Sequence, residues 1–229
     1  MINVGDVISY WDMCSQERSM LQKGMNFRVH GKISVFLMSL RRGAPYADRV
    51  EDNGRILIYE GHDTPRRGGV TDPKSMDQPM IIEGKLTQNG LFFEAAHRYK
   101  RGEQEPELVR VYEKVRAGIW TYNGHFRLLD AWQEQSGTRQ VFKYRLEIAE
   151  ESDTMMEAGD IGEHTRVIPS SVKVEVWKRD KGHCMVCGSA DNLHFDHIIP
   201  YSKGGSSLTA ANIQLLCSRC NISKKDRIE

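Results

Sequence analysis

Cysteines with the spacing of metal ligands stand near the end of the 229-residue chain. They form two CxxC pairs, Cys184 with Cys187 and Cys217 with Cys220, and 29 residues separate the pairs. Each pair offers two thiolates to one metal, so the two together predict a tetrahedral structural zinc site. Disulfide bonds are the alternative. They are disfavoured because Cys14 is left over and because an intracellular chain keeps its thiols reduced.

A carboxylate, imidazoles, amides and lysines follow one another between and after these pairs. The chain reads LHFDHIIP over 193–200, SKGG over 202–205, ANIQLL over 211–216 and NISKKD over 221–226. With the cysteines, this order resembles the HNH endonuclease domain over residues 172–229. The resemblance implies a ββα-metal fold that hydrolyses the DNA backbone with the help of a divalent cation.

The resemblance assigns a role to each polar residue of this motif. Asp196, at the end of the first strand, is the expected carboxylate ligand, and hard oxygen ligands favour Mg²⁺ or Mn²⁺. Asn221 takes the place of the family's final histidine and supplies the second ligand by its amide oxygen. His197 projects to the other side of the strand and is the candidate general base. This motif therefore reads His-Asn-Asn, because Asn212 is its central member.

Further residues around this centre have supporting roles. Asn212 is expected to tie back the loop and hold the backbone or ring of His197. Lys224 and Lys225, one helical turn after Asn221, are expected to contact DNA phosphate. His194 shares the strand face of Asp196, and two interpretations stay open: an extra ligand or phosphate contact, and a partly buried structural histidine.

The first part of the chain holds aromatic and polar residues that resemble an SRA (YDG) domain, in diffuse form over residues 30–149. The resemblance rests on segments 44–61, 77–78, 86–90, 109–112 and 118–128 and on the strand Val141–Ile148. The YDG tripeptide itself reads YNG at 122–124. That family reads 5-methylcytosine or 5-hydroxymethylcytosine by flipping the base into a pocket. A flipped pyrimidine needs aromatic faces and a polar partner for its Watson–Crick edge.

The resemblance places Tyr46 and Tyr59 as the aromatic residues that stack on the flipped base. Asp48 is the candidate for the edge contact. The interval between the tyrosines is one residue longer than in the eukaryotic pattern, and Arg49 stands where the pocket aspartate aligns most directly. Glu51 and Asp77 therefore remain alternatives to Asp48.

The elements that position these residues are mostly strands in residues 1–149. Short runs rich in β-branched and aromatic residues alternate with turn signals, such as the Asn-Gly pairs at 53–54, 89–90 and 123–124. This pattern predicts a barrel or a twisted antiparallel sheet, with helices near Tyr10–Lys23 and Asp77–Leu86, and with the SRA resemblance the expected form is a twisted β-barrel. The polar, acidic stretch 150–168 is expected to be a linker. Residues 169–229 form the expected nuclease domain, so the fold class is α+β with two domains.

Charge is distributed in keeping with this division. Residues 1–149 hold 22 Lys and Arg against 19 Asp and Glu, and residues 171–229 hold 9 against 6. The stretch 150–170 holds one Arg against six acidic residues, so the net charge of +1 conceals two mildly basic parts. Such parts are compatible with DNA, although ordinary surface scatter gives the same numbers.

Several partners and compartments are disfavoured by the sequence. It has no apolar run of the length a membrane span needs and no signal peptide at Met1–Asp6, so a cytoplasmic protein is expected. A P-loop for a nucleoside triphosphate is also absent.

Together these features predict a modification-dependent restriction endonuclease acting on double-stranded DNA that carries modified cytosine, with zinc as structural metal and Mg²⁺ or Mn²⁺ as catalytic metal. One such site cuts one strand, so a homodimer is expected for double-strand cleavage. Two alternatives remain: an HNH endonuclease targeted to unmodified sequence or another modified base, and a zinc-dependent DNA-binding module that does not cut.

Overall fold

The computed structural model describes residues 2–21, 23–41, 43–66, 72–149, 168–200, 203, 205–225 and 227. The expected linker 150–168 lies outside these residues except for Ile168. The elements of the first part are β1 (Val7–Ser9), α1 (Tyr10–Gln16), β2 (Met25–Val29), β3 (Ile33–Met38), β4 (Arg49–Glu51), β5 (Ile56–Glu60), β6 (Ile81–Ile82), β7 (Lys85–Leu86), α2 (Gln88–Lys100), β8 (Glu107–Arg116), β9 (Ile119–Ser136) and β10 (Arg139–Ile148). The C-terminal elements are α4 (Ser170–Arg179), β11 (Leu193–His197), β12 (Ile213–Cys217) and α5 (Ser218–Lys224).

The first part of the chain is built on one open sheet. Its strands are ordered β2-β3-β8-β9-β10-β5-β4, and β1 pairs with β9 at the side of this path. The strands pair antiparallel except β3 with β8, which are parallel. In the described part of the chain β2 and β4 do not pair with each other, so of the two predicted forms the structure has the twisted sheet: it curves as a barrel does but does not close.

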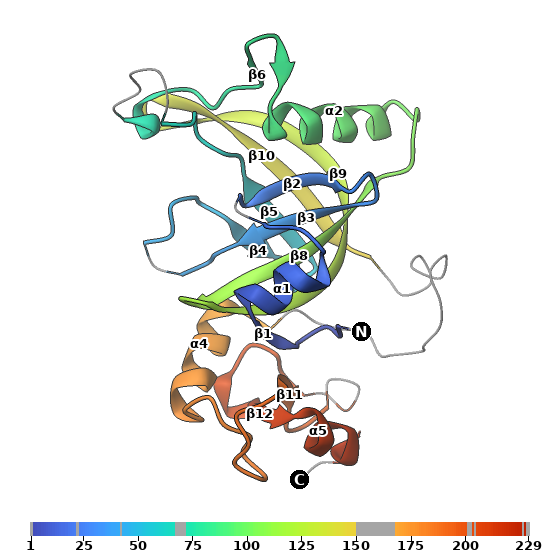
Figure 1. The fold of residues 1–229 in the computed structure, drawn as a ribbon, viewed down its shortest axis with the longest axis vertical. Coiled ribbons are helices and arrows are strands. Elements are labelled where there is room, and N and C mark those ends of the chain that lie inside the picture. Colours follow the sequence, from blue (N-terminus) through green and yellow to red (C-terminus); the bar gives the residue numbers. More distant parts are fainter. Residues whose placement is uncertain are drawn as a thin grey trace.

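The curvature is concentrated in the long strands β8, β9 and β10, which bend around the core in Figure 1. The pairing register shifts between Arg110 and Tyr112, between Lys114 and Arg116, and between Arg145 and Leu146. Such irregularities add a residue on one strand and increase its bend and twist. The sheet therefore wraps partway round its core without the hydrogen bonds that would close it.

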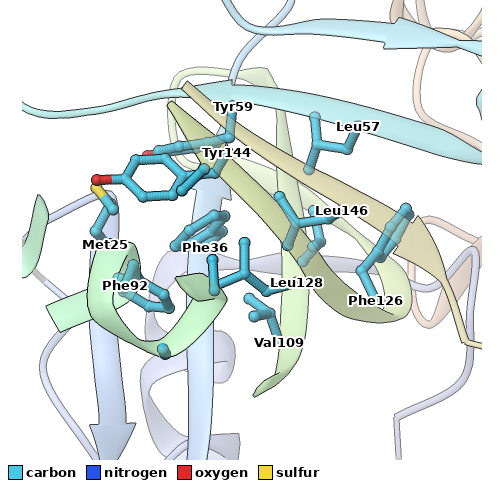
Figure 2. Close-up of a cluster of buried hydrophobic side chains, with 14 of the residues drawn as sticks. Met25, Phe36, Leu57, Tyr59, Phe92, Val109, Phe126, Leu128, Tyr144 and Leu146 are labelled. Carbon is cyan, nitrogen blue, oxygen red and sulfur yellow. The ribbon is translucent and has the colours of Figure 1, made fainter. Parts of the chain in front are cut away.

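Each face of the sheet carries its own apolar cluster. The larger cluster lies under α2 and includes Phe36, Phe92 and Tyr144, and Figure 2 shows Tyr59 among them. The cluster on the opposite face joins Met13 and Cys14 of α1 to Tyr112 and Trp120, along with Val35, Leu21 and Tyr122. Val35 and Phe36 are neighbours on β3 and lie in different clusters, because successive strand residues point to opposite faces.

Helix α2 begins later than the sequence pattern predicts. Residues 81–86, expected to be helical, form the hairpin of β6 and β7, and the helix covers Gln88–Lys100. Thr87 caps it by accepting from the Gly90 backbone N–H. Gly90, which belongs to the Asn-Gly pair at 89–90 expected to form a turn, lies within this helix instead, and it must be a glycine because a Cβ there would lie 2.5 Å from the Met80 carbonyl oxygen.

The C-terminal part forms a small unit at one end of the molecule, seen as the orange and red elements of Figure 1. Strands β11 and β12 pair antiparallel, and α5 packs against both. Helix α4 packs on β12, and their apolar side chains form a further core with Ile213, Leu215 and Phe195. Val115 of β8 is buried in this same core, and Val7 and Ile119 pack against it.

None of the helices in the described ranges is both long and apolar enough to cross a membrane.

Candidate nuclease centre and base-binding cavity

The four cysteines of the two CxxC pairs meet at one place. The Sγ atoms of Cys184, Cys187, Cys217 and Cys220 all lie within 4.8 Å of one another, and the Sγ atoms of Cys187 and Cys217 are 3.6 Å apart. Four thiolates at such separations fit the tetrahedral shell that zinc prefers. Cys217 and Cys220 flank the start of α5, so a zinc ion would fix that helix to the loop after α4.

Asp196 stands on β11 opposite Gln214 of β12. Its Oδ2 atom is buried and makes no hydrogen bond of good geometry, but the Lys224 ammonium lies 2.9 Å away. The cation that this oxygen meets in the structure is the Lys224 ammonium, and a carboxylate is also the type of ligand that a hard divalent cation prefers. Bound there, a divalent cation supplies positive charge for the leaving 3′ oxygen of the backbone.

The position of Lys224 does not match the DNA phosphate contact predicted for it. Its side chain is 1% exposed, and its ammonium also donates to the carbonyl oxygen of His197. A buried ammonium that already has two oxygen partners cannot present itself to a DNA phosphate. Lys224 therefore connects α5 to β11, and the expected phosphate contact at this position is corrected. Lys225, the next residue, is exposed and remains the candidate for the phosphate contact.

His197 is held by the loop that follows its strand. Its Nε2 atom lies 2.8 Å from the Ser207 hydroxyl oxygen. It is half-buried, next to Asp196 along the strand, so its ring points to the other face. Asn221 is also half-buried, on α5, which packs against β11. Asp196 and His197 thus lie on β11, and Asn221 lies on the helix that packs against this strand.

Asn212 closes the loop between the two strands. Its Oδ1 atom accepts from the Ile199 backbone N–H at 2.8 Å, and its Nδ2 atom donates to the carbonyl oxygens of Ile199 and Ser206. Gly205 must be small here, because a Cβ would lie 1.7 Å from the Ile199 carbonyl oxygen. Asn212 thus ties back the loop as expected. These hydrogen bonds reach Ile199 and Ser206 rather than His197.

His194 has structural partners on both ring nitrogens. Its Nδ1 atom lies 2.5 Å from Oδ1 of Asp6, near the start of the chain, and its Nε2 atom lies 2.7 Å from the Ser218 hydroxyl oxygen. Both nitrogens are therefore engaged. Of the two interpretations left open, the structure favours the structural histidine.

A cavity of about 720 Å³ opens in the first part of the chain. Tyr46, Asp48 and Tyr59, the three residues expected to read a base, all line it. Glu51 and Asp77, the alternatives to Asp48, do not line it: Glu51 pairs with Arg49, and Asp77 accepts from the Gln140 backbone N–H. The structure thus brings the predicted pocket residues together and leaves both alternatives elsewhere.

Asp48 is held by the backbone on two sides. Its Oδ1 accepts from the Glu60 N–H at 3.0 Å and its Oδ2 from the Ser39 N–H at 3.2 Å. Burial outweighs these hydrogen bonds and raises the pKa of Asp48 to about 7. The carboxyl group therefore changes its protonation state close to neutral pH, inside the cavity wall.

The two tyrosines are placed differently. Tyr46 is half-buried, its ring stacks on His62 with centroids 5.2 Å apart, and the Lys74 ammonium lies 4.2 Å from the ring centroid. Tyr59 is only 1% exposed and stacks on Phe36 within the core of Figure 2. The hydroxyl group of Tyr59 is the part that reaches toward the cavity, since it lies 3.2 Å from His62 Nε2.

His62 is a cavity residue that sequence reasoning missed. Burial lowers the pKa of His62 to about 4, so its ring is neutral near pH 7. Gly24 is a second, because a Cβ there would lie 2.5 Å from the Tyr59 hydroxyl oxygen and 2.7 Å from His62 Nε2. The only sequence signal for His62 is its position directly after the strand that carries Tyr59.

Comparisons with known proteins bear on both parts. Residues 184–227 match the HNH endonuclease family model. Among solved structures, the SRA domain of SUVH5 bound to hemimethylated CG DNA is similar with 24% identity and a TM-score of 0.46, over 65% of this chain and 89% of that one. The modification-dependent TagI restriction endonuclease is similar with 19% identity and a TM-score of 0.40, over 96% of this chain and 76% of that one. No curated protein sequence matches the chain.

The match over 184–227 covers both cysteine pairs, Asp196, His197, Asn212 and Asn221. The C-terminal part is therefore an HNH endonuclease domain, and the protein is a nuclease.

Proposed function

We propose that this protein is a modification-dependent DNA endonuclease that flips 5-methylcytosine or 5-hydroxymethylcytosine into the cavity and cuts the backbone with its HNH domain. The observation that carries the proposal is the cavity itself, because it gathers Tyr46, Asp48 and Tyr59 in a chain that also holds a nuclease domain. The SRA-like sheet of the first part supplies the framework for this cavity.

The cavity has the chemistry that a flipped cytosine requires. Tyr46 offers an aromatic ring at the half-buried rim, and Asp48 offers an acceptor for the exocyclic amino group of the base. His62, neutral and hydrogen-bonded to Tyr59, gives the inner wall a polar group without a positive charge. Since a methylated and an unmodified cytosine share the same Watson–Crick edge, discrimination between them depends on the space beside the C5 atom.

The nuclease domain has the groups for hydrolysis. His197, oriented by Ser207, is proposed to take a proton from the attacking water. Asp196 and Asn221 are proposed to hold a Mg²⁺ or Mn²⁺ ion, and the four cysteines a zinc ion. Asn212 keeps the intervening loop in place, so that His197 and Ser207 stay within hydrogen-bonding distance.

Matched digestion tests the proposal directly. Three duplexes of identical sequence carry cytosine, 5-methylcytosine or 5-hydroxymethylcytosine at one position, and each is incubated with the protein and Mg²⁺ or Mn²⁺. Preferential cutting of at least one modified duplex is expected, whereas equal cutting of all three contradicts the proposed reading of modification.

A single variant tests whether the modified base is recognised in this cavity. Tyr46→Ala is expected to reduce the preference for modified DNA at least tenfold while leaving zinc content unchanged, because Tyr46 lies far from the cysteines in sequence and on the other part of the molecule. Arg49→Ala, on the neighbouring exposed strand β4, is the matched control. An unchanged preference in Tyr46→Ala would place the reader elsewhere.

A further inference from the structure

A buried polar cluster joins the nuclease domain to the SRA-like sheet. The Lys173 ammonium donates to Glu113 Oε2 at 2.6 Å and to Asn123 Oδ1 at 2.7 Å, and Asn123 Nδ2 donates to the same Glu113 oxygen at 2.9 Å. All three residues are buried, none more than 2% exposed. We call Lys173, Glu113 and Asn123 the clamp.

The clamp connects two parts that are far apart in the sequence. Lys173 lies on α4, which packs on β12 of the nuclease domain, whereas Glu113 and Asn123 lie on β8 and β9 of the sheet. Figure 1 shows α4 directly below the ends of these long strands. One lysine of the nuclease domain therefore has its charge neutralised inside the other part of the molecule.

Two further contacts hold the same pair of parts together. Asp6 and His194 form a bridge between the N-terminal segment and β11, where the backbone N–H of Phe195 also donates to the Gly5 carbonyl oxygen. Val115, two residues after Glu113, is buried in the apolar core of the nuclease domain. The attachment thus consists of a buried ion pair, a strand-like bridge and shared apolar burial.

A buried ion pair specifies geometry more than it adds stability. Removing two charged groups from water offsets most of their attraction, so an apolar contact would hold the parts together equally well. The clamp differs from such a contact because its donors and acceptors fit in one orientation, and misalignment would leave a charge buried and unpaired. Such a cluster is suited to fixing the angle between the two parts.

The clamp also lies close to the cavity. Asn123 Nδ2 is 4.0 Å from the Met38 sulfur, and Met38 lines the cavity. Lys114, next to Glu113 on β8, lines it as well. The path from the cavity wall to α4 therefore runs through only three residues: Met38, Asn123 and Lys173.

We propose that the clamp fixes the nuclease centre at a set distance from the flipped base, so that cleavage falls at a narrow group of positions. Lys173, Glu113 and Asn123 are positioning residues in this proposal, because none of them touches DNA or metal. The proposal rests on the proposed function, since the distance is counted from the base that the cavity takes.

Cleavage mapping tests the proposal. A long duplex with a single modified cytosine and labelled ends is digested under single-turnover conditions, and every cut position is read on a denaturing gel. The wild type is expected to cut within a few nucleotides of one preferred position on each strand. Lys173→Met is expected to spread the cuts over at least twice as many positions, with modified-base affinity and zinc content unchanged.

Two further variants separate positioning from folding. In Lys173→Met with Glu113→Gln, the neutral amide at 113 can pair with Asn123, so no charge is left buried and unpaired, and folding and zinc content are expected to be those of the wild type. The cuts are expected to stay broad, because Lys173, the member of the clamp on α4, is gone. Lys178→Met, on the exposed side of α4, is the matched control and is expected to cut as the wild type does. Should Lys173→Met lose zinc or fail to fold, the double variant and the wild-type pattern still carry the test.

The outcomes distinguish this inference from the proposed function. Scattered cuts by the wild type, or the same narrow pattern in the wild type and a folded Lys173→Met, overturn the clamp. The narrow wild-type pattern in the folded double variant also overturns it. Equal cutting of modified and unmodified duplexes overturns the proposed function instead.

Discussion

Asp48 is the clearest case of a residue whose surroundings change its chemistry. Its carboxyl group accepts two backbone hydrogen bonds, yet burial raises its pKa to about 7. At lower pH it is neutral, and at higher pH it is an anion able to accept strongly from the amino group of a base.

The protonation of Asp48 predicts a pH dependence of base binding. Because the anion is the better acceptor for the amino group of a flipped base, the affinity for modified DNA is expected to increase from pH 6 to pH 8, with a midpoint near 7. Asp48→Asn is expected to remove this dependence and to weaken the binding of modified DNA at pH 8 at least fivefold. Fluorescence anisotropy with the two duplexes across this pH range is the measurement. A Glu51→Gln control should keep the wild-type profile, and a flat profile in the wild type would contradict the assignment.

His197 gives the corresponding prediction for the nuclease centre. A positioned general base contributes about 10²- to 10⁴-fold to a rate, so His197→Ala is expected to reduce cleavage by that range. Binding of modified DNA and zinc content should stay as in the wild type, because His197 lies in neither the cavity nor the cysteine site. Nicking of a methylated supercoiled plasmid measures the loss, and near-normal nicking would remove His197 from the mechanism.

At the scale of elements, the nuclease centre depends on the contact between β11 and α5. The Lys224 ammonium lies between the Asp196 carboxylate and the His197 carbonyl oxygen, so a helix residue holds the strand that carries both candidate catalytic groups. The neighbouring Lys225 is exposed at the end of the same helix.

Two neighbouring lysines therefore make a matched pair of variants. Lys224→Met is expected to reduce cleavage at least tenfold with little effect on DNA affinity, because it loosens α5 from β11. Lys225→Met is expected to weaken DNA binding at low salt two- to fivefold, with the cleavage rate at saturating protein nearly unchanged. Binding isotherms and single-turnover rates give both quantities. If Lys224→Met weakened DNA binding and Lys225→Met slowed cleavage instead, Lys224 would be the phosphate contact.

Sequence reasoning was strongest where residue type and spacing determine the element. The cysteine spacing predicted four thiolates around one point, and the resemblance to the HNH endonuclease domain implied the strand pair of β11 and β12. It failed where the outcome depends on contacts distant in sequence. The residues around Lys224 in the sequence do not indicate that it is buried against Asp196. Similarly, the residues around Gly90 fit a loop turn as well as the first turn of a helix, and only the contact with Met80 distinguishes the two.

Whether the sheet closes into a barrel could not be predicted for the same reason. Strand propensity and alternation predict strands, but closure depends on whether the edge strands meet, and the described β2 and β4 do not. The clamp could not be predicted from sequence at all, since Lys173 on an amphipathic helix is ordinarily exposed.

The charge of the whole molecule bears on how it finds DNA. Two mildly basic parts with a net charge of +1 for the full chain imply few phosphate contacts and modest non-specific affinity. Recognition of a base inside a cavity adds a contribution that salt screens much less, because that contact is made away from solvent.

Salt therefore separates the two contributions. Raising the salt concentration from 50 to 200 mM is expected to lower the affinity for unmodified and modified duplexes by similar factors, so that their ratio changes less than threefold. Lys225→Met should reduce the slope of log affinity against log salt by about 1 for both duplexes. Parallel titrations at four salt concentrations give the slopes. A ratio that collapses with salt would place discrimination on the charged surface rather than in the cavity.

The contact of β1 with both β9 and β11 has a consequence for the order of events during synthesis. Among the described elements β1 leaves the ribosome before all others, and β11 is among the last. The N-terminal strand can complete its contacts only after β11 has emerged. A nascent chain stalled before Cys217 would contain the finished sheet without a working cutter, so nuclease activity would arise last, once the cavity that directs it is already built.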